Sequence, residues 1–393
     1  SMARKSTRAA QGSGTIRQRS DGRWEARFTV GRDPGTGKQI QRSIYGSTQK
    51  EVRQKLAQAV AEIDSGTYQA PSKMTVGQWL DIWTAEYLNH VRPRTVEAYK
   101  CQIKNHIRPA LGAVKLDTLT TPTIQSFYNA MSHHDGDKPG LSAKSIKNVH
   151  GILHKALQQA VTVGYLRFNP ADACTLPRVE RKELKPLDET DTARFIEAVK
   201  GHRYETLFLV TLFTGMREGE VLGLTWDCVD FKRGTLTVNK QLQKTTTGGS
   251  VYTLVPTKNG KGRVVAPAPF VMGLLQTQRK RQLEWRLKAG PMWEDSGLVF
   301  TDEAGRHLCH HTVYQNYKRV VASIGIPSAR FHDLRHSFAV ASIRAGDDIK
   351  TVQGNLGHAT AAFTLDVYGH VTDQMKQASA ARMEQYIKNV VGG

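Results

Sequence analysis

The chain has 393 residues, and 39% of them are hydrophobic, which is enough to build the cores of two or three domains. Its 55 Lys and Arg residues against 35 Asp and Glu residues give a formal net charge of +20, so a polyanion is the expected partner. No apolar run reaches the length of about 18 residues that a transmembrane helix needs, so the sequence offers no membrane-spanning alternative.

The cysteines and the N-terminus indicate a cellular compartment. The four cysteines, Cys101, Cys174, Cys228 and Cys309, lack the spacing of a disulfide framework or a zinc site, which is typical of proteins in a reducing compartment. The N-terminus lacks the apolar core of a signal peptide. We therefore expect a cytoplasmic protein.

Residues 1 to 12 are small and basic and predict a disordered arm, whereas residues 13 to 66 predict a small α+β domain. Apolar and polar residues alternate between turn signals at Asp21-Gly22 and at residues 33 to 38, which predicts three antiparallel strands. The apolar face of the central strand would carry Trp24, Ala26, Phe28 and Val30. The exposed face would carry four arginines: Arg17, Arg23, Arg27 and Arg42.

A helix is expected after this sheet. Thr48 and Glu51 have the spacing of a capping box, in which each side chain bonds the backbone N–H of the other residue. The helix would bury an apolar stripe of Val52, Leu56, Val60 and Ile63. The arginine face of the sheet is suited to a DNA major groove, and the alternative is a solvated basic surface without a ligand.

Residues 74 to 172 predict an all-α domain behind a proline-containing linker. Helical spacing predicts one helix between Val76 and Tyr87, a second around residues 96 to 103, a third over residues 119 to 131 and a fourth over residues 142 to 163. The candidate phosphate contacts on the second and fourth helices are Arg94, Lys100, Lys104, Lys144 and Lys147. Alternatively, these side chains only keep the helices soluble.

Residues 173 to 187 form a charged linker, and residues 188 to 393 predict a mainly α-helical domain with a small β-sheet. A helix over residues 188 to 200 opens this domain, and a nearly unbroken apolar helix over residues 207 to 213 ends before Gly215. Arg217 would then start a new helix on a buried scaffold. Two strands around an Asn-Gly turn would place Lys258 at a hairpin tip, ahead of a helix over 271 to 287 and a short buried strand over 298 to 300.

Residues 330 to 370 combine an apolar framework with side chains suited to an anion. Asp333 is placed to cap a helix that Gly346 ends. Its apolar positions are Leu334, Phe338 and Ala341. His332 and Arg335 would share one face at the N-terminus of that helix, where free N–H groups favour a phosphate. By themselves, however, a His-x-x-Arg pair and a tyrosine are more often a salt-bridged helix start and a packing residue.

Three further segments complete the domain. A second helix is expected on Ile349, Val352 and Leu356, with Gly357 at its end and His358 directly after it. Tyr368 follows in a short segment whose apolar positions are Phe363, Leu365 and Val367. The last helix carries an apolar stripe of Met375, Met383, Tyr386 and Val390, and a stripe of this kind usually packs on its own domain.

Five motifs in this domain, TGMREGE, TKNGKGR, HDLRH, LGH and the final Tyr-Gly-His, resemble in order and spacing those of the tyrosine recombinases, the phage and transposon integrase family. The resemblance is closest to conjugative-transposon integrases. It implies the tyrosine recombinase fold, with an arm-type DNA-binding domain over residues 13 to 66, a core-binding domain over 74 to 172, and a catalytic domain over 188 to 393 that ends in an exchange helix. The implied catalytic residues are Arg217, Lys258, His332, Arg335, His358 and Tyr368.

Phosphodiester chemistry explains why these residue types are needed. Arginine binds non-bridging phosphate oxygens with a rigid fork, so Arg217 and Arg335 would neutralise the developing charge. Tyr368 would attack once a base, for which His332 is the candidate, removes the phenol proton. The resemblance assigns to Lys258 the protonation of the leaving 5′ oxygen.

The remaining implied role belongs to His358, which would bond the phosphate or help to position Tyr368. The product would be a 3′-phosphotyrosyl enzyme, which a 5′-hydroxyl from another strand resolves. No metal or other cofactor is expected, because the nearby aspartates lack ligand spacing and Arg335 would repel a cation between His332 and His336.

The implied function is that of a recombinase that integrates and excises a mobile element. The implied partners are double-stranded DNA at core and arm sites, a homotetramer, an excisionase and a host DNA-bending protein, in the nucleoid of a bacterial cytoplasm. Two alternatives are a DNA-relaxing enzyme of the type IB topoisomerase kind, which would use similar chemistry, and a DNA-binding protein without catalysis. Strand exchange between two duplexes separates the first, and a covalent adduct excludes the second.

Overall fold

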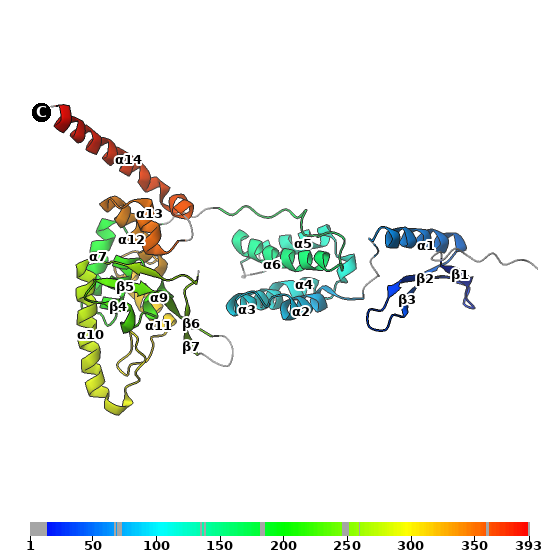
Figure 1. Ribbon diagram of the computed structural model, residues 1–393, viewed down its shortest axis with the longest axis horizontal. Coiled ribbons are helices and arrows are strands. Elements are labelled where there is room, and N and C mark those ends of the chain that lie inside the picture. The colour runs from blue at the N-terminus through cyan, green and yellow to red at the C-terminus, as the bar shows by residue number, and fades with distance from the viewer. Residues whose placement is uncertain are drawn as a thin grey trace, which may run out of the picture. The chain divides into compact units, whose positions relative to one another are not determined.

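A computed structural model describes residues 14–66, 68, 73–133, 136, 139–180, 185–245, 251–258, 260–358 and 361–391 (Figure 1). Within residues 361–375, side chains are described only at Thr364 and Tyr368. The chain divides into two compact units, residues 1–180 and 181–393. The expected disordered arm, residues 1 to 12, lies outside the described residues.

The first part of unit one is a three-stranded antiparallel sheet of order β1-β2-β3, formed by β1 (Thr15–Gln18), β2 (Trp24–Arg32) and β3 (Gln39–Gly46). Helix α1 (Gln49–Asp64) covers one face, as Figure 1 shows, so the predicted strands and helix are present. Ala26 and Phe28 pack there against Val52, Leu56 and Ala59. The predicted stripe packs on this core, with Val52 and Leu56 buried and with Val60 and Ile63 half-buried against the same cluster, which Ala59 also joins.

Two details of this sheet correct the sequence analysis. Arg42 lies opposite Phe28 in the β2–β3 register, and directly opposite residues share a face, so Arg42 is on the helix-covered face and not on the open one. The side chain of Thr48 caps α1 by accepting from the N–H of Glu51. The carboxylate of Glu51, however, accepts from the N–H of Ser47 at 2.9 Å, so the expected reciprocal bond shifts by one residue.

The second part of unit one is helical, with α2 (Val76–Glu86), α3 (Pro93–Gln102), α5 (Thr121–Ser132) and α6 (Ala143–Thr162) at the predicted places. The second helix runs further than expected, through a π-helical turn η1 (Ile103–Ile107) into α4 (Arg108–Leu111), and a 3-10 turn η2 (Leu116–Thr118) follows. The helices enclose an apolar core. Within it, the indole N–H of Trp79 donates to the carbonyl of Ala156 at 2.8 Å.

Unit two opens with α7 (Glu189–Val199), α8 (Glu205–Thr214), α9 (Glu218–Leu222) and the 3-10 turn η3 (Trp226–Cys228). A sheet of order β4-β5-β8 contains β4 (Val229–Asp230), β5 (Thr235–Val238) and β8 (Arg263–Val265), and a second sheet pairs β6 (Lys240–Lys244) with β7 (Tyr252–Pro256). The expected hairpin is therefore wrong. Only Asn239 separates β5 from β6, so the chain passes from one sheet to the other there. As a result, β7 pairs with β6 and β8 pairs with β5, and β7 and β8 do not pair with each other.

The rest of unit two is helical, with α10 (Pro269–Ala289), the 3-10 turn η4 (Gly290–Met292), α11 (His310–Ser323), α12 (Phe331–Ala345), α13 (Ile349–Leu356) and α14 (Ala361–Val391). Leu298, Val299 and Phe300 are buried as predicted, but they form a single bridge from Leu298 to Thr225 and not a strand. None of the helices in the described ranges is long and apolar enough to cross a membrane.

Three expectations about the C-terminal helices need correction. Helix α12 starts after Arg330, so Asp333 is its third residue and accepts from the N–H of Arg330 at 2.7 Å instead of being the N-cap. Ala341 is exposed, because the face of α12 that packs inward carries Val340 and Ile343. The segment around Tyr368 and the last helix are one continuous helix of 31 residues, whose C-terminal part, drawn red in Figure 1, projects away from α12 and α13.

Candidate active site

A buried arginine lies at the centre of the site. Arg335, on the first turns of α12, is 2% exposed and donates to the carbonyls of Gly215 at 2.8 Å and Leu356 at 2.7 Å. These carbonyls lie at the C-terminal ends of α8 and α13, where backbone acceptors are free and the helix dipole favours a cation. Burial, followed by the charge of Arg217, lowers the pKa of Arg335 to about 9. The guanidinium is therefore still charged at neutral pH.

The local sequence around Gly215 makes this arrangement possible. Gly215 ends α8 with φ of 66°, a conformation that favours glycine, and any Cβ there would collide with the ring of Phe338. The sharp turn brings Arg217 to the N-cap of α9, on the same side as Arg335. The predicted start of a new helix at Arg217 is thus present.

Arg217 is held by a buried carboxylate. Its Nη1 donates to Oε1 of Glu220 at 2.8 Å, its backbone N–H donates to Oε2 at 2.9 Å, and its Nη2 lies 3.5 Å from the carbonyl oxygen of Gly357. Glu220 is 1% exposed, whereas the side chain of Arg217 is 27% exposed. Arg217 therefore keeps donor groups that a ligand can reach.

A third arginine, Arg263, which is not among the predicted site residues, completes this cluster. Arg263, on β8, donates from Nη1 and Nη2 to the two oxygens of Glu220 at 3.0 and 2.8 Å. Nothing in the local pattern of TKNGKGR distinguishes this arginine from an ordinary strand residue. Its partner lies 43 positions away in the sequence, so only the folded chain reveals the contact.

Two histidines beside these arginines have lowered pKa values. His332 is exposed on the first turn of α12, but desolvation by its neighbours, followed by the charge of Arg335, lowers its pKa, and the same two causes lower the pKa of half-buried His358 to about 3. His358 follows α13, and a hydrogen bond of 2.8 Å joins its Nδ1 and Oγ1 of Thr364. A neutral imidazole can accept a proton, which suits His332 to a role as a base.

Tyr368 lies inside the domain. Its side chain is 1% exposed and packs in an apolar cluster with Ala339, Val340, Ile343, Val352 and Leu356. The hydroxyl lies 2.5 Å from Nδ1 of His336. Burial raises the pKa of Tyr368 to about 12 and, with the further effect of His332, lowers the pKa of His336 to about 4. The phenol therefore keeps its proton, and its hydroxyl shares a hydrogen bond with a neutral imidazole ring.

His336 is the second residue that the sequence analysis did not assign. The signal was present, because His332 and His336 are four residues apart on one helix face, and their rings meet edge to face at 4.8 Å between centroids. That spacing was considered only as a zinc motif. The structure instead gives His336 the hydroxyl of the tyrosine as its partner.

The structure brings five of the six predicted catalytic residues to one region and places the sixth on a loop. Both arginines approach carbonyls at the end of α13, directly before His358. In addition to desolvation, their charges lower the pKa of His358 and of His332. The helix that carries Tyr368 packs on α12, which carries Arg335. Lys258 is exposed on the connection between β7 and β8, next to a turn in which the N–H of Gly260 donates to the carbonyl of Thr257.

The predicted DNA contacts of the small sheet are mostly on its open face. Arg17 and Arg27 are about half exposed and form ion pairs with Glu25 at 2.7 and 3.0 Å. Glu25 is only 1% exposed, and the bonds from Arg17 and then Arg27 lower its pKa to about 2. Arg23 is exposed beside the turn before β2, so three of the four arginines share the open side, and Arg42 does not.

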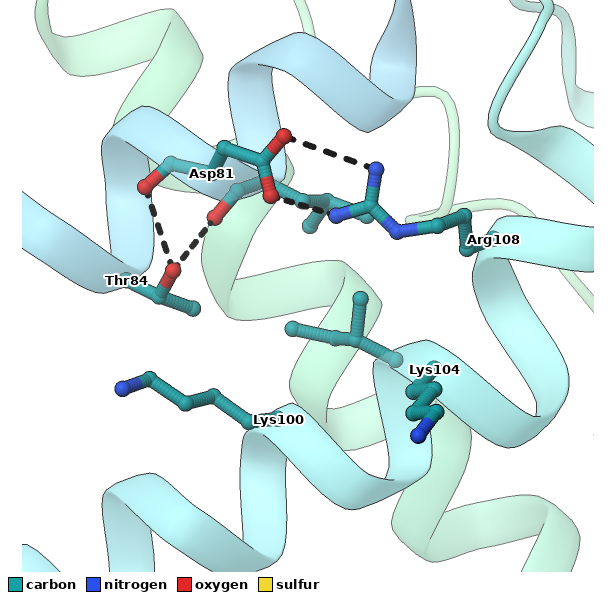
Figure 2. Close-up of a pocket in the computed structure, with 7 residues that line it drawn as sticks. Asp81, Thr84, Lys100, Lys104 and Arg108 are labelled. Atoms are coloured by element: carbon teal, nitrogen blue, oxygen red, sulfur yellow. Dashed lines mark hydrogen bonds and ion pairs between the residues drawn. The ribbon is translucent and has the colours of Figure 1, made fainter.

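The predicted contacts of the helical domain are exposed: Arg94, Lys100, Lys104, Lys144 and Lys147. Lys100 and Lys104 line a pocket of about 310 Å³ together with Asp81, Thr84 and Arg108 (Figure 2). In that pocket the guanidinium of Arg108 faces the carboxylate of Asp81 at 2.5 Å. Neither lysine pairs with Asp81; Lys100 lies 3.5 Å from the carboxylate of Glu97, with 53% of its side chain exposed.

The site thus combines two guanidinium groups, which can bind a phosphate, with imidazoles and a phenol, residue types that can act as bases and as a nucleophile. Residues 185–375 match the phage integrase family, and residues 75–132 match the SAM-like N-terminal domain of phage integrases. A tyrosine recombinase XerC-like protein of Caldanaerobacter subterraneus subsp. tengcongensis is 31% identical over 370 residues, which are 88% of this chain and 92% of that protein.

Other similar proteins agree. The ICEBs1 integrase of Bacillus subtilis is 24% identical over 95% of this chain and 100% of its own length. The Tn1549 transposon integrase in complex with transposon right end DNA has a TM-score of 0.66 at 22% identity, and the match covers 79% of this chain and 100% of that chain. A lambda integrase tetramer bound to a Holliday junction has a TM-score of 0.55 at 20% identity, over 88% of this chain and 96% of that chain.

The chain therefore belongs to the phage integrase, or tyrosine recombinase, family. It has the tyrosine recombinase fold and is a site-specific recombinase, which confirms the predicted family, fold class and enzyme class.

Proposed function

We propose that the chain is the integrase of a mobile element and that it cleaves and rejoins duplex DNA through a 3′-phosphotyrosyl intermediate. The observation that carries this proposal is the position of Tyr368, whose hydroxyl is bound by a histidine of the same helix that holds the buried Arg335. The integrases of the transposon Tn1549 and of ICEBs1 are among the similar proteins, which supports a mobile element as the source.

Arg217 and Arg335 would bind the non-bridging oxygens of the scissile phosphate. Arg217 is anchored on Glu220 with 27% of its side chain exposed, so it would need little reorganisation to meet the phosphate. Arg335 is anchored on two carbonyls but is only 2% exposed, so it would meet the phosphate only after the side chains that cover it have moved. Preorganised donors in a site of low dielectric stabilise developing charge more strongly than water does. His358, held by Thr364, would add a bond to the same phosphate or help to position Tyr368.

Tyr368 would attack the phosphorus, with His332 accepting the phenol proton. At 1% exposure the hydroxyl cannot meet a phosphate in the observed position, so the tyrosine must first leave the apolar cluster and give up its bond to His336. Lys258 would protonate the leaving 5′ oxygen, and its exposed place on a loop allows it to approach the bound DNA.

We further propose that the domains divide the work. Residues 13–66 would bind arm sites, residues 74–172 would bind core sites, residues 173–187 would link them to the catalytic residues 188–393, and residues 1–12 would be a basic arm. The working form would be a homotetramer on DNA in the bacterial cytoplasm, assisted by an excisionase and a host DNA-bending protein. Arg17, Arg23 and Arg27 would contact arm DNA, and Lys100, Lys104, Lys144, Lys147 and Arg94 core DNA.

The test is covalent trapping. The full chain is incubated, without divalent metal, with duplexes from the element's ends that carry a nick beside the cleavage position, and products are resolved on a denaturing gel. We expect a protein–DNA band for the parent and none for Tyr368→Phe. The matched control is Tyr386→Phe, because Tyr386 is exposed on the same helix and should leave the band unchanged. A band from Tyr368→Phe would exclude Tyr368 as the nucleophile.

A further inference from the structure

We propose that Arg263 is a positioning residue of the site, which fixes Glu220 and through it orients Arg217 for the scissile phosphate. This inference rests on the proposed function, because it assigns to Arg217 the binding of that phosphate. Arg263 itself would not contact DNA.

The contacts of Arg263 point inward. Its Nη1 and Nη2 donate to the two oxygens of Glu220 at 3.0 and 2.8 Å, and its Nε donates to the carbonyl of Asn355 at 2.7 Å. The side chain is 11% exposed, compared with 27% for Arg217. Both edges of the Arg263 fork are thus used inside the protein, whereas Arg217 keeps donors for a ligand.

Glu220 is the element that joins the two arginines. It is 1% exposed, and its Oε1 accepts from both Arg217 and Arg263. Burial by itself raises the pKa of Glu220, but the bond and charge of Arg263, followed by those of Arg217, lower it to about 2. Because the side chain of Arg263 bonds both oxygens of Glu220, whereas the side chain of Arg217 bonds only Oε1, Arg263 is the main counter-ion of the carboxylate.

The same arginine also ties the carboxylate to the end of α13. Asn355, whose carbonyl binds Nε of Arg263, is three residues before His358. A Cβ on Gly357 would lie 3.0 Å from Nη1 of Arg263, so the glycine lets the two segments approach. The carbonyl of Gly357, next to His358, also lies 3.5 Å from Nη2 of Arg217. Arg263 therefore helps to hold Arg217 and His358 close together, although 141 positions separate them in the sequence (358 minus 217).

Loss of Arg263 would change what Glu220 does. With its main counter-ion gone, the carboxylate would turn fully toward Arg217 and compete with DNA phosphate for the same donors. A misplacement of a catalytic group by about 1 Å can cost roughly 100-fold in rate. We therefore expect Arg263→Ala to slow cleavage by about 10-fold to 100-fold, by the same reasoning.

The experiment measures the first-order rate of covalent complex formation by the full chain on saturating nicked duplex. The variants are Arg263→Ala, Arg263→Lys, Glu220→Gln and the double variant Arg263→Ala with Glu220→Gln. The matched control is Arg306→Ala, which removes a surface arginine paired with Asp302 in the same unit. Thermal unfolding of each variant is recorded, and Arg263→Lys, which keeps the charge, serves if Arg263→Ala does not fold.

Two readouts separate positioning from mere structure. Because Arg263 acts through Glu220, its substitution should have little effect once the Glu220→Gln change is present, so the two rate losses should not multiply. The loss should also shrink on a duplex with a methylphosphonate at the scissile position, because a neutral phosphate does not compete with Glu220 for Arg217. A folding defect alone would lower the rates on both duplexes by the same factor.

The outcomes are distinguishable. If the parent forms no Tyr368-dependent complex, the proposed function fails and the rates of the variants have no meaning. If the parent reacts and both folded Arg263 variants react at the parental rate, the inference about Arg263 is wrong. Multiplying losses in the double variant would also overturn it, since they would assign to Arg263 a direct contact with the phosphate.

Discussion

At the scale of single residues, the site depends on buried polar groups with exact partners among distant segments. Arg335 is the clearest example, because a 2% exposed cation is satisfied by two carbonyls at helix ends. Such a group contributes to stability and to chemistry at once. Its removal should therefore be visible in both measurements.

We expect Arg335→Lys to keep the charge but to bond only one of the two carbonyls. A buried acceptor left without a donor costs about 1–3 kcal/mol in the free energy of unfolding. The loss of one preorganised donor to the phosphate should lower the cleavage rate roughly 100-fold to 1,000-fold. Denaturant unfolding and the covalent-complex assay measure the two effects. Parental values in both assays would contradict the role given to this fork.

The contact between His336 and Tyr368 makes a separate prediction. His336→Phe keeps an aromatic ring but leaves the buried hydroxyl of Tyr368 without its hydrogen-bond partner, at a cost of about 1–3 kcal/mol of stability. Tyr368→Phe in the same chain removes that hydroxyl and should restore part of the loss. A double-mutant cycle in thermal or denaturant unfolding should give a coupling energy of about 1 kcal/mol. Strict additivity of the two changes would show that the 2.5 Å contact has no energetic weight.

The histidines also predict a dependence of stability on pH. The pKa values of His336 and His358 are lowered from an ordinary value of 6.5 to about 4 and about 3. Because each folded-state pKa is below the unfolded-state value, the unfolded chain takes up protons first as the pH falls. The stability associated with their neutral state is therefore fully present above about pH 6.5, and the free energy of unfolding falls progressively toward pH 4 and below. The melting temperature should fall across this window, and His336→Gln should reduce the slope.

At the scale of elements, α14 has two parts with different roles. Tyr368 is buried, whereas the described side chains from Lys376 to Val391 are exposed, with exposed fractions of 57% for Met383 and 63% for Tyr386. Large apolar side chains on an unpaired helix face are suited to a second protein surface. This favours docking on a neighbouring protomer over packing on the helix's own domain.

We expect the double change Met383→Glu and Tyr386→Glu to leave the melting temperature within the error of the parental value, because neither side chain packs on the rest of the described chain. Assemblies of several protomers on DNA should be lost in native gels or light scattering. Gln385→Glu, on the same exposed helix, is the control for added charge. A large drop in melting temperature for the double variant would indicate that the helix packs on its own domain.

The elements also show where local patterns were sufficient. Helix ends were predicted well where a glycine with positive φ stands at the C-terminus, as at Gly346 and Gly357, because that signal is local. The hairpin around Lys258 was wrong because strand partners are chosen over long distances. Local alternation cannot show that β7 pairs with β6 while β8 pairs with β5.

At the scale of the whole molecule, the net charge of +20 should dominate DNA affinity. Each neutralised phosphate adds about 0.9 to the slope of log affinity against log salt concentration. Lys144→Gln with Lys147→Gln should therefore reduce that slope by about 2 without changing the melting temperature, since both lysines are exposed. Binding isotherms at several salt concentrations measure the slope. An unchanged slope would remove these two lysines from the set of phosphate contacts.

The sequence by itself determined the family, most of the helices and the residue types of the site, because motif order, helix periodicity and caps are properties of neighbouring residues. It did not predict β4, β5, β6 or α11. Only the tertiary structure decided how those residues are held. Three contacts join residues that lie 14 to 43 positions apart. They are the ion pair of Glu220 with Arg263, the hydrogen bond between Tyr368 and His336, and the pairing that places Arg42 opposite Phe28 on the covered face. Such contacts depend on the path of the chain between them, and the free energy that selects one path is shared among many buried residues.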